Sequence, residues 1–216
     1  MRIIDLSHTI SKEMPVYPGT PLPELAPVLT LAAHGFGETM LQMLSHTGTH
    51  IDAPSHMIEG APCLNDLPVN TFFGQAVIID HPPSAGMRIE LMTLQNIKEK
   101  LERAEFVLFN TGHSQKWGEA EYFGVFPTLT KEAAQFLTNF SLKGVGIDAI
   151  SFDAIGAADN PIHHILLGAG FILIENLTNL NQVQGEYCTL SVLPLKYINA
   201  DGSPVRAVAI LRSEAG

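Results

Sequence analysis

Hydrophobic residues along the chain form two patterns, one typical of β-strands and one typical of α-helices. In the middle of the sequence the two patterns alternate. Short apolar runs bounded by turn residues, such as 74–81 and 171–176, are typical of buried strands. Apolar residues three or four positions apart, among strong helix formers, predict helices over 90–105 and 129–143. The other expected elements are a helix over 160–170 and strands at the N-terminus and over 106–112, 144–148, 187–195 and 205–211.

Helix ends are marked by residues with a physical role. Thr130 is expected to cap the helix over 129–143, and Asn160 and Pro161 are typical of a helix start at 160–170. Strands alternate with helices in the middle of the chain and dominate both ends. We therefore expect an α/β fold in which a mixed β-sheet is flanked by helices.

The 216 residues show no internal repeat and no low-complexity linker, so we expect one domain over 1–216. The segment 14–27, MPVYPGTPLPELAP, is predicted to be a loop because its prolines fix φ and remove amide donors. A long loop rich in apolar residues is uncommon unless it covers a site or packs on a partner.

Composition excludes several classes of function. Charged residues make up only 16% of the chain, yet no run of 18 apolar residues appears, which argues against a membrane span. The formal net charge is −10 and basic residues do not cluster, which argues against a nucleic-acid partner. The start of the chain reads as a mature strand, not a signal peptide. Cys63 and Cys188 lie far apart, so free thiols and a cytoplasmic location are expected.

One short segment concentrates the chemistry of the chain. The stretch HTGTHIDAPSH contains His46, His50, Asp52 and His56, all at even positions. In an extended strand these four side chains would lie on one face, whereas the glycine, the proline and the β-branched residues disfavour a helix. Imidazole and carboxylate together suit zinc, manganese or iron, and the lack of a nearby cysteine favours an open catalytic site. The alternative is a polar edge strand.

A site with these ligands needs partners from elsewhere in the fold. His163 and His164 both lie in the first turn of the helix expected over 160–170. Glu175 ends a strongly apolar strand, where a carboxylate is costly unless it is paired or bound to a metal. Helix geometry alone does not choose between the two histidines, and each of the three residues also has an ordinary reading as a surface or pairing group.

HTGTHIDAPSH resembles the signature of the cyclase family of metal-dependent hydrolases, which includes the bacterial kynurenine formamidases. Four further segments resemble other blocks of that family and extend the similarity over most of the chain: IIDLSHTISKEMPVYPG, FNTG, GVGIDAISFD and HHILLGAGFILIENL. The resemblance implies a single domain with the swivelling β/β/α architecture of the family.

The resemblance also implies roles for individual residues. The positions that match the family's metal ligands are His46, His50, Asp52, His163 and Glu175. His56 matches the catalytic acid/base, and His164 stands where relatives often have arginine. Two zinc ions in each subunit are implied, and manganese is an alternative because some relatives work with one manganese.

Two positions depart from the family pattern. Tyr17 stands where kynurenine formamidases usually have a tryptophan that lines the substrate pocket, and His113 stands where relatives commonly have tryptophan. Both changes affect aromatic walls and not the metal ligands, so they bear on the substrate. Asp148 and Asp153 are read as turn and capping residues without a catalytic role.

These observations lead to a functional hypothesis with two alternatives. The leading one is metal-dependent hydrolysis of a small-molecule amide, an aryl formamide such as N-formylkynurenine, in tryptophan catabolism to kynurenine. The first alternative is single-manganese hydrolysis of a cyclic amide or lactone, as in isatin hydrolase. The second is a metal-binding protein without catalysis, which would have no use for His56 beside the ligands. The family resemblance implies a homodimer or a larger homo-oligomer.

Overall fold

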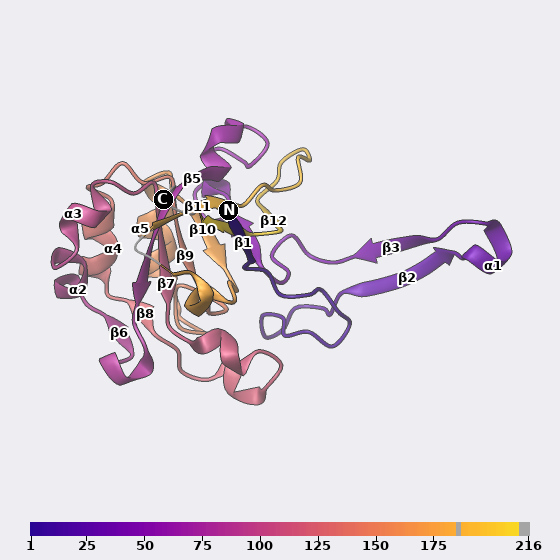
Figure 1. The fold of residues 1–216 in the computed structure, drawn as a ribbon, viewed down its shortest axis with the longest axis horizontal. Helices are drawn as coiled ribbons and strands as arrows, with labels where there is room; N and C mark the ends of the chain where they lie inside the picture. Colours follow the sequence, from indigo (N-terminus) through magenta and orange to yellow (C-terminus); the bar gives the residue numbers. More distant parts are fainter. Residues whose placement is uncertain (185–186, 212–216) are drawn as a thin grey trace.

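The fold is built on one long mixed sheet, seen in a computed structural model that describes residues 1–184 and 187–211 (Figure 1). The strands, in their spatial order, are β1 (Arg2–Asp5), β13 (Val208–Leu211), β11 (Tyr187–Ser191), β5 (Phe73–Asp80), β7 (Phe106–Asn110), β9 (Gly144–Ile147), β10 (Ile172–Glu175), β4 (His50–Asp52) and β12 (Gly202–Pro204). The four strands from β5 to β10 pair in parallel, and the strands on both sides of them pair antiparallel. The expected α/β fold with a mixed sheet and flanking helices is confirmed.

Four α-helices lie together beside the parallel strands, on the left of the sheet in Figure 1. They are α2 (Leu91–Gln95), α3 (Lys98–Leu101), α4 (Lys131–Leu137) and α5 (Pro161–Gly168). A small parallel sheet joins β6 (Arg88–Ile89) to β8 (Thr128–Leu129). Short 3-10 helices occupy the connections: η1 (Pro54–His56), η2 (Val69–Phe72), η3 (Pro83–Ala85), η4 (His113–Lys116), η5 (Ala120–Phe123) and η6 (Leu180–Gln182). Within the described part of the chain, no helix is long and apolar enough to cross a lipid bilayer.

Alternation along the central strands divides the core into two clusters, one on each face of the sheet. On β7, Val107 and Phe109 belong to the cluster that the helices cover, whereas Phe106 and Leu108 belong to the other. All four side chains are fully buried, which is why this segment reads as a continuous apolar run. The expectation of a buried strand here is confirmed.

A hairpin projects from the sheet like an arm and contains β2 (Glu24–Leu29), α1 (Leu31–His34) and β3 (Glu38–Gln42) (Figure 1). We call residues 24–42 the arm. Every residue of 30–42 is exposed. The prediction of a loop over 14–27 is wrong at its end, because β2 begins at Glu24, and β3 was not foreseen.

Two other expectations need correction. The helix expected over 90–105 is divided into α2 and α3, because Ile97 leaves helical geometry (φ −119°, ψ 19°) while its side chain packs on the core. Tertiary packing overrides helix propensity at this point. Thr130 caps α4 as expected, since its side chain accepts a hydrogen bond from the Ala133 amide, but Asn160 makes no such bond at the start of α5.

The pairing of β9 with β10 depends on a residue without a side chain. Gly144 lies opposite Ile172, and a Cβ at Gly144 would lie 2.6 Å from the Ile172 carbonyl oxygen. We expect Gly144→Ala to lower the free energy of unfolding by about 1–3 kcal/mol, the usual cost of overpacking. Denaturant titration measures this change.

Gly168→Ala is the matched control for this prediction. A Cβ at Gly168 would meet only Ile58 Cδ1, at an ordinary contact distance of 3.8 Å. Its stability should equal or slightly exceed that of the wild type, because alanine has the higher helix propensity. Equal stability of both variants and the wild type would contradict the proposed crowding at Gly144.

Candidate functional site

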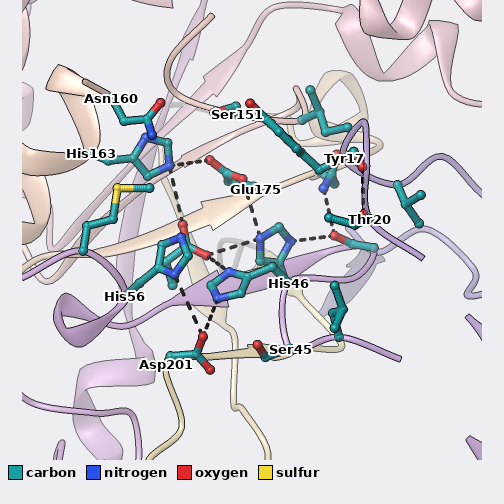
Figure 2. A pocket seen from close by; sticks show the side chains of 18 of the residues that line it. Tyr17, Thr20, Ser45, His46, His56, Ser151, Asn160, His163, Glu175 and Asp201 are labelled. Carbon is teal, nitrogen blue, oxygen red and sulfur yellow. Dashed lines mark hydrogen bonds and ion pairs between the residues drawn. The ribbon is translucent and has the colours of Figure 1, made fainter. Parts of the chain in front are cut away.

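A cavity of about 450 Å³ lies where β4 and β10 meet the start of α5 (Figure 2). Its polar wall is formed by His46, His50, Asp52, His56, Ser151, Asn160, His163, Glu175, Asn176 and Asp201, and its apolar wall includes Pro15, Val16, Tyr17, Leu44, Met57 and Ile150. The structure therefore brings together all seven of the residues that the sequence singled out as ligands, acid/base or substrate contact.

Three of the buried side chains are placed by the pairing of β4 with β10. Asp52 and His50 are two positions apart on β4, so they share one face, while Ile51 between them is buried in the opposite core cluster. Glu175 pairs directly with His50 across the antiparallel ladder and therefore lies on the same face. The side chains of all three are at most 6% exposed.

The rest of the HTGTHIDAPSH segment is not extended, so the prediction of one continuous strand is wrong. Gly48 has φ +66°, a conformation that favours glycine, and it turns the chain between His46 and β4. Pro54 starts the 3-10 helix η1, which carries His56. His46 and His56 thus reach the site through two turns that flank a three-residue strand.

His163 reaches the site from the first turn of α5. The Asp153 carboxylate accepts hydrogen bonds from the amides of Ile162 and His163 and a third, at 2.7 Å, from His163 Nδ1. Asp153 is therefore the cap that the sequence expected from Asn160, and it also orients a site histidine. His164 is exposed and bonds only to the Asn160 carbonyl oxygen among the described contacts.

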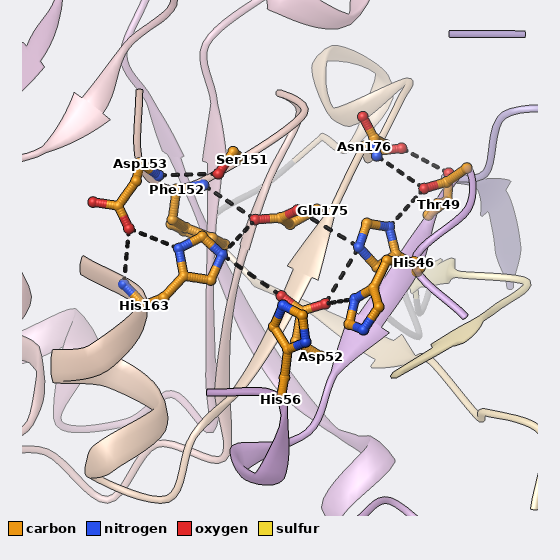
Figure 3. Close-up of polar contacts among 12 residues, drawn as sticks. His46, Thr49, Asp52, His56, Ser151, Phe152, Asp153, His163, Glu175 and Asn176 are labelled. Carbon is orange, nitrogen blue, oxygen red and sulfur yellow. Dashed lines mark hydrogen bonds and ion pairs between the residues drawn. The ribbon is translucent and has the colours of Figure 1, made fainter. Parts of the chain in front are cut away.

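The buried carboxylates are those of Asp52 and Glu175, and in each of them one oxygen faces one side of the site and the other oxygen faces the opposite side (Figure 3). On one side, Asp52 Oδ1 lies 2.6 Å from His46 Nδ1 and 3.3 Å from His50 Nε2, and Glu175 Oε2 lies 3.5 Å from the same His50 nitrogen. On the other side, His163 Nε2 lies 3.2 Å from Glu175 Oε1 and 3.8 Å from Asp52 Oδ2. This arrangement forms two adjacent groups of donor atoms that share both carboxylates.

The electrostatics of the site show how these charges are balanced. Burial would raise the pKa of Asp52, but hydrogen bonds and charge from His46 and His50 hold that pKa well below its usual value. Burial opposes charge on His46, yet Asp52 and Asp201 raise its pKa to about 9. Burial likewise opposes charge on His163, whose pKa is raised to about 10 by Asp153 and Glu175.

These side chains fit a divalent metal ion. None of the described residues that line the cavity is lysine or arginine, so only the imidazoles balance the two buried carboxylates. Bound protons can supply that positive charge, and a divalent cation can replace them, since imidazole ligands bind metals in the neutral form. His50, Asp52 and Glu175 offer ligand atoms within 4.8 Å of one another, as do His46, Asp52 and His56.

Each of the imidazoles closest to the carboxylates is anchored through its other ring nitrogen. His50 Nδ1 donates to the Gly48 carbonyl oxygen at 2.8 Å, and His163 Nδ1 donates to Asp153. His46 Nε2 contacts Asp201 Oδ2 at 3.1 Å. Such partners fix the tautomer and the ring orientation of a metal ligand.

His56 differs from the other three histidines. It lies nearer the opening, with 27% of its side chain exposed, and burial lowers its pKa to about 4 although the Asp52 charge acts in the opposite direction. Among the described contacts, the shortest distance from a ring nitrogen of His56 to a carboxylate oxygen is 4.0 Å, from Nδ1 to Asp201 Oδ2. Its imidazole is thus neutral, and although its ligand atom lies within 4.8 Å of those of His46 and Asp52, its shortest described contact with a carboxylate is longer than those of the other three histidines.

Sequence reasoning missed two functional candidates. Asp153 was read only as a capping residue, which is correct but incomplete, because it also holds His163. Asp201 was not considered. The segment NADGSP that contains it is a turn signal, and turn signals give no indication of distant contacts.

Of the other residues that the sequence singled out, Tyr17 is among the residues that line the cavity, whereas His113 and Asp148 are not, so the expectation that His113 forms part of an aromatic wall is wrong. Tyr17 is 38% exposed. His113 is buried and bonds to the Tyr122 carbonyl oxygen, while the Tyr122 hydroxyl donates to Asn176, the residue after Glu175. Asp148 is buried and accepts bonds from the Thr111 amide and hydroxyl and from the Gly112 amide, so it joins the ends of two strands, and its reading as a local turn residue is wrong.

Comparison with known families and curated proteins gives consistent matches. The family model described as "Putative cyclase" matches residues 4–154. The kynurenine formamidase of Salinibacter ruber is 32% identical over 217 residues, which cover 96% of this chain and 97% of that protein. The kynurenine formamidase of Bacillus cytotoxicus is 31% identical over 95% of both chains. Cyclase-like protein 2 of Oryza sativa is 29% identical over 97% of this chain and 79% of its own.

Comparison with solved structures also gives matches over nearly the whole chain. Isatin hydrolase A from Labrenzia aggregata, bound to benzyl benzoate, superposes with a TM-score of 0.88 at 29% identity and covers 96% of this chain and 93% of its own. A protein described as a potential metal-dependent hydrolase with cyclase activity superposes with a TM-score of 0.81 at 30% identity over 98% of both chains.

A glycine in β12 makes room for His46. Gly202 pairs with Asp52, and a Cβ at this position would lie 2.5–2.6 Å from Cε1 and Nε2 of the His46 ring. We expect Gly202→Ala to displace that ring and to weaken divalent metal binding by about 10–100-fold, as loss of a ligand's support does. Metal affinity is measured by competition with a chromogenic chelator, with Gly168→Ala as the control. Wild-type affinity in Gly202→Ala would contradict the close approach.

Proposed function

Because this chain belongs to the cyclase family of metal-dependent hydrolases, we propose that it cleaves an aryl formamide such as N-formylkynurenine, releasing formate and the aryl amine. It is a metal-dependent hydrolase that acts on carbon–nitrogen bonds other than peptide bonds. The observation that carries the proposal is the pair of buried carboxylates, Asp52 and Glu175, shared between two groups of imidazoles. A substrate in the tryptophan-to-kynurenine route agrees with the names of the curated relatives.

We assign two divalent ions to the two groups of donor atoms. His46 and His50 would hold the first ion and His163 the second, while Asp52 and Glu175 would contribute one oxygen to each. Zinc is the proposed metal because imidazole nitrogen and carboxylate oxygen are both common zinc ligands, and manganese accepts the same set.

The chain's own residues account for the movement of protons. Bound divalent ions supply Lewis acidity, which polarises the amide carbonyl and lowers the pKa of water. His56, neutral at pH 7, takes a proton from the attacking water as its oxygen bonds to the carbonyl carbon. The same imidazole then gives that proton to the departing nitrogen as the carbon–nitrogen bond breaks. General acid–base catalysis of this kind contributes on the order of 10²–10⁴ in rate.

The apolar wall of the cavity suits the aryl group. Tyr17, Leu44 and Ile150 line the same cavity as the polar cluster. We propose that Tyr17 contacts the substrate ring and replaces the tryptophan of related formamidases. The likeness to isatin hydrolase A supports a second candidate, hydrolysis of a cyclic aryl amide at the same site.

The arm supports a homodimer. A two-stranded hairpin is marginally stable on its own, and this one exposes large apolar side chains: Val28, Leu31, Phe36, Met40 and Leu41. It points away from its own sheet (Figure 1), so a second copy is the proposed cover. The 193–198 loop beside the cavity also exposes apolar side chains and Lys196, and in the proposed dimer Lys196 would meet Glu24 and Glu38 of the second copy's arm.

The free thiols of Cys63 and Cys188 support the further proposal of a cytoplasmic location.

Metal content and turnover together test the proposed function. Protein purified without chelators should carry about two divalent ions per chain and hydrolyse N-formylkynurenine faster than isatin. Removal of the metal should abolish both activities, and zinc or manganese should restore them. One ion per chain with a preference for isatin would support the second candidate, and bound metal without any turnover would support a metal-binding protein.

Variants separate metal binding from proton transfer in the same assay. Glu175→Ala should lose both metal and turnover, because Glu175 is assigned to both ions. His56→Ala should keep its metal and lose turnover by on the order of 10²-fold or more. Should His56→Ala also lose the metal, the histidine is a ligand and the acid/base assignment is wrong.

The arm predicts the oligomeric state. Wild-type protein should be a dimer by light scattering after size-exclusion chromatography. The triple variant Leu31→Ser, Phe36→Ser and Met40→Ser should shift toward the monomer, because it removes apolar area from the proposed interface. Met92→Ser, at an exposed position on α2, is the control and should remain dimeric. A monomeric wild-type protein would refute the proposal.

A further inference from the structure

Asp201 lies at the rim of the cavity, between two imidazoles that come from opposite ends of the HTGTHIDAPSH segment (Figure 2). Its Oδ2 atom is 3.1 Å from His46 Nε2 and 4.0 Å from His56 Nδ1. The rings of His46 and His56 themselves are in contact, with centroids 3.9 Å apart and planes tilted by 35°. One carboxylate oxygen thus faces both the proposed metal ligand and the proposed acid/base.

The position of Asp201 is itself held by several contacts. The Tyr197 hydroxyl donates to Asp201 Oδ1 at 3.4 Å and to the Gly202 carbonyl oxygen at 2.5 Å. Ser45 also hydrogen-bonds the Asp201 carboxylate. The Asp201 carbonyl oxygen accepts from the Ala53 amide at 2.8 Å, which ties the loop to the segment between β4 and η1. The carboxylate is therefore fixed relative to both histidines.

The position of this carboxylate assigns opposite roles to the two nitrogens of His56. Because Nδ1 faces Asp201, Nε2 is the nitrogen left to exchange a proton with water and with the departing amine. During that exchange His56 carries a positive charge for a short time, and a carboxylate 4.0 Å from its Nδ1 stabilises that charge. A carboxylate that orients an imidazole in this way is the usual partner of an acid/base histidine.

We propose that Asp201 is the positioning residue of His56, which it holds with Nε2 toward the substrate while it also supports His46. This proposal deepens the function proposed above and rests on it for its kinetic tests. One proton leaves water for His56 Nε2 and the same proton reaches the departing nitrogen, so Asp201 neither gains nor loses a proton.

The first test needs no substrate. Two-bond ¹H–¹⁵N correlation spectra of the histidine side chains report which ring nitrogen carries the proton. In the metal-loaded wild type we expect His56 to be in the Nδ1–H form, and in Asp201→Asn we expect that population to fall. An unchanged His56 tautomer would overturn the proposal, whatever the protein's substrate proves to be.

The second test uses formanilides whose aniline leaving groups differ in basicity. Asp201→Asn should lower kcat by about 10–100-fold, as loss of an outer partner does, and leave KM within about threefold. The loss should be largest for 4-methoxyformanilide and smallest for 4-nitroformanilide, because a weakly basic aniline departs with less need of a proton from His56. Equal losses for all substrates would overturn the proposal.

A double-mutant cycle separates an effect on His56 from an effect on the metal. In the His56→Ala background, adding Asp201→Asn should lower kcat by less than about threefold, because both changes remove the same step. A full additional loss, together with loss of bound metal, would assign Asp201 to His46 alone and overturn the proposal. Asp201→Glu should recover part of the activity.

Asp159→Asn is the matched control. Asp159 is an exposed carboxylate beside Asn160, which lines the same cavity, so the variant makes the same change of formal charge nearby. It should keep the kcat, the leaving-group dependence and the His56 tautomer of the wild type. If Asp159→Asn reproduces the changes of Asp201→Asn, net charge near the cavity is the cause and the proposal is wrong.

Discussion

Two carboxylates buried side by side are the constraint on which the rest of this structure depends. Asp52 and Glu175 lie on adjacent strands with their side chains almost out of contact with water. Uncompensated charges in such a place would be costly, so the surrounding fold has to supply positive charge at short range. Imidazoles from two separate segments, 46–56 and the start of α5, do so, and they leave nitrogen and oxygen atoms arranged as a metal site.

The elements around the carboxylates can be understood as supports for that arrangement. The antiparallel pairing of β10 with β4 places Glu175 opposite His50, and β12 closes over His46 with a glycine. The start of α5 is held by Asp153, whose carboxylate is both helix cap and partner of His163. Stability and chemistry therefore depend on the same contacts.

The sequence indicated which residues form the site more clearly than it indicated how those residues are arranged. Short continuous apolar runs were enough to predict the central strands, and the combination of imidazole with carboxylate marked the segment 46–56 as a site. The prediction that this segment is extended throughout was wrong, because one glycine with positive φ and one proline turn the chain twice within eleven residues. Asp201 was missed because its partner His46 is distant in the chain, and β3 was missed because all five of its residues are exposed, so no buried face marks it as a strand.

The distance along the chain between the parts of the site has a consequence for biosynthesis. His46 and Asp201 are 155 residues apart, and the first strand, β1, finds its neighbour only in the last one, β13. Contacts of such long range form slowly, and a ribosome releases the chain from its N-terminal end. The ligands on β4 therefore emerge long before β12 can cover them. A nascent chain would expose the two carboxylates to the solvent until residues 201–204 have left the ribosome, and it would acquire the complete site only then.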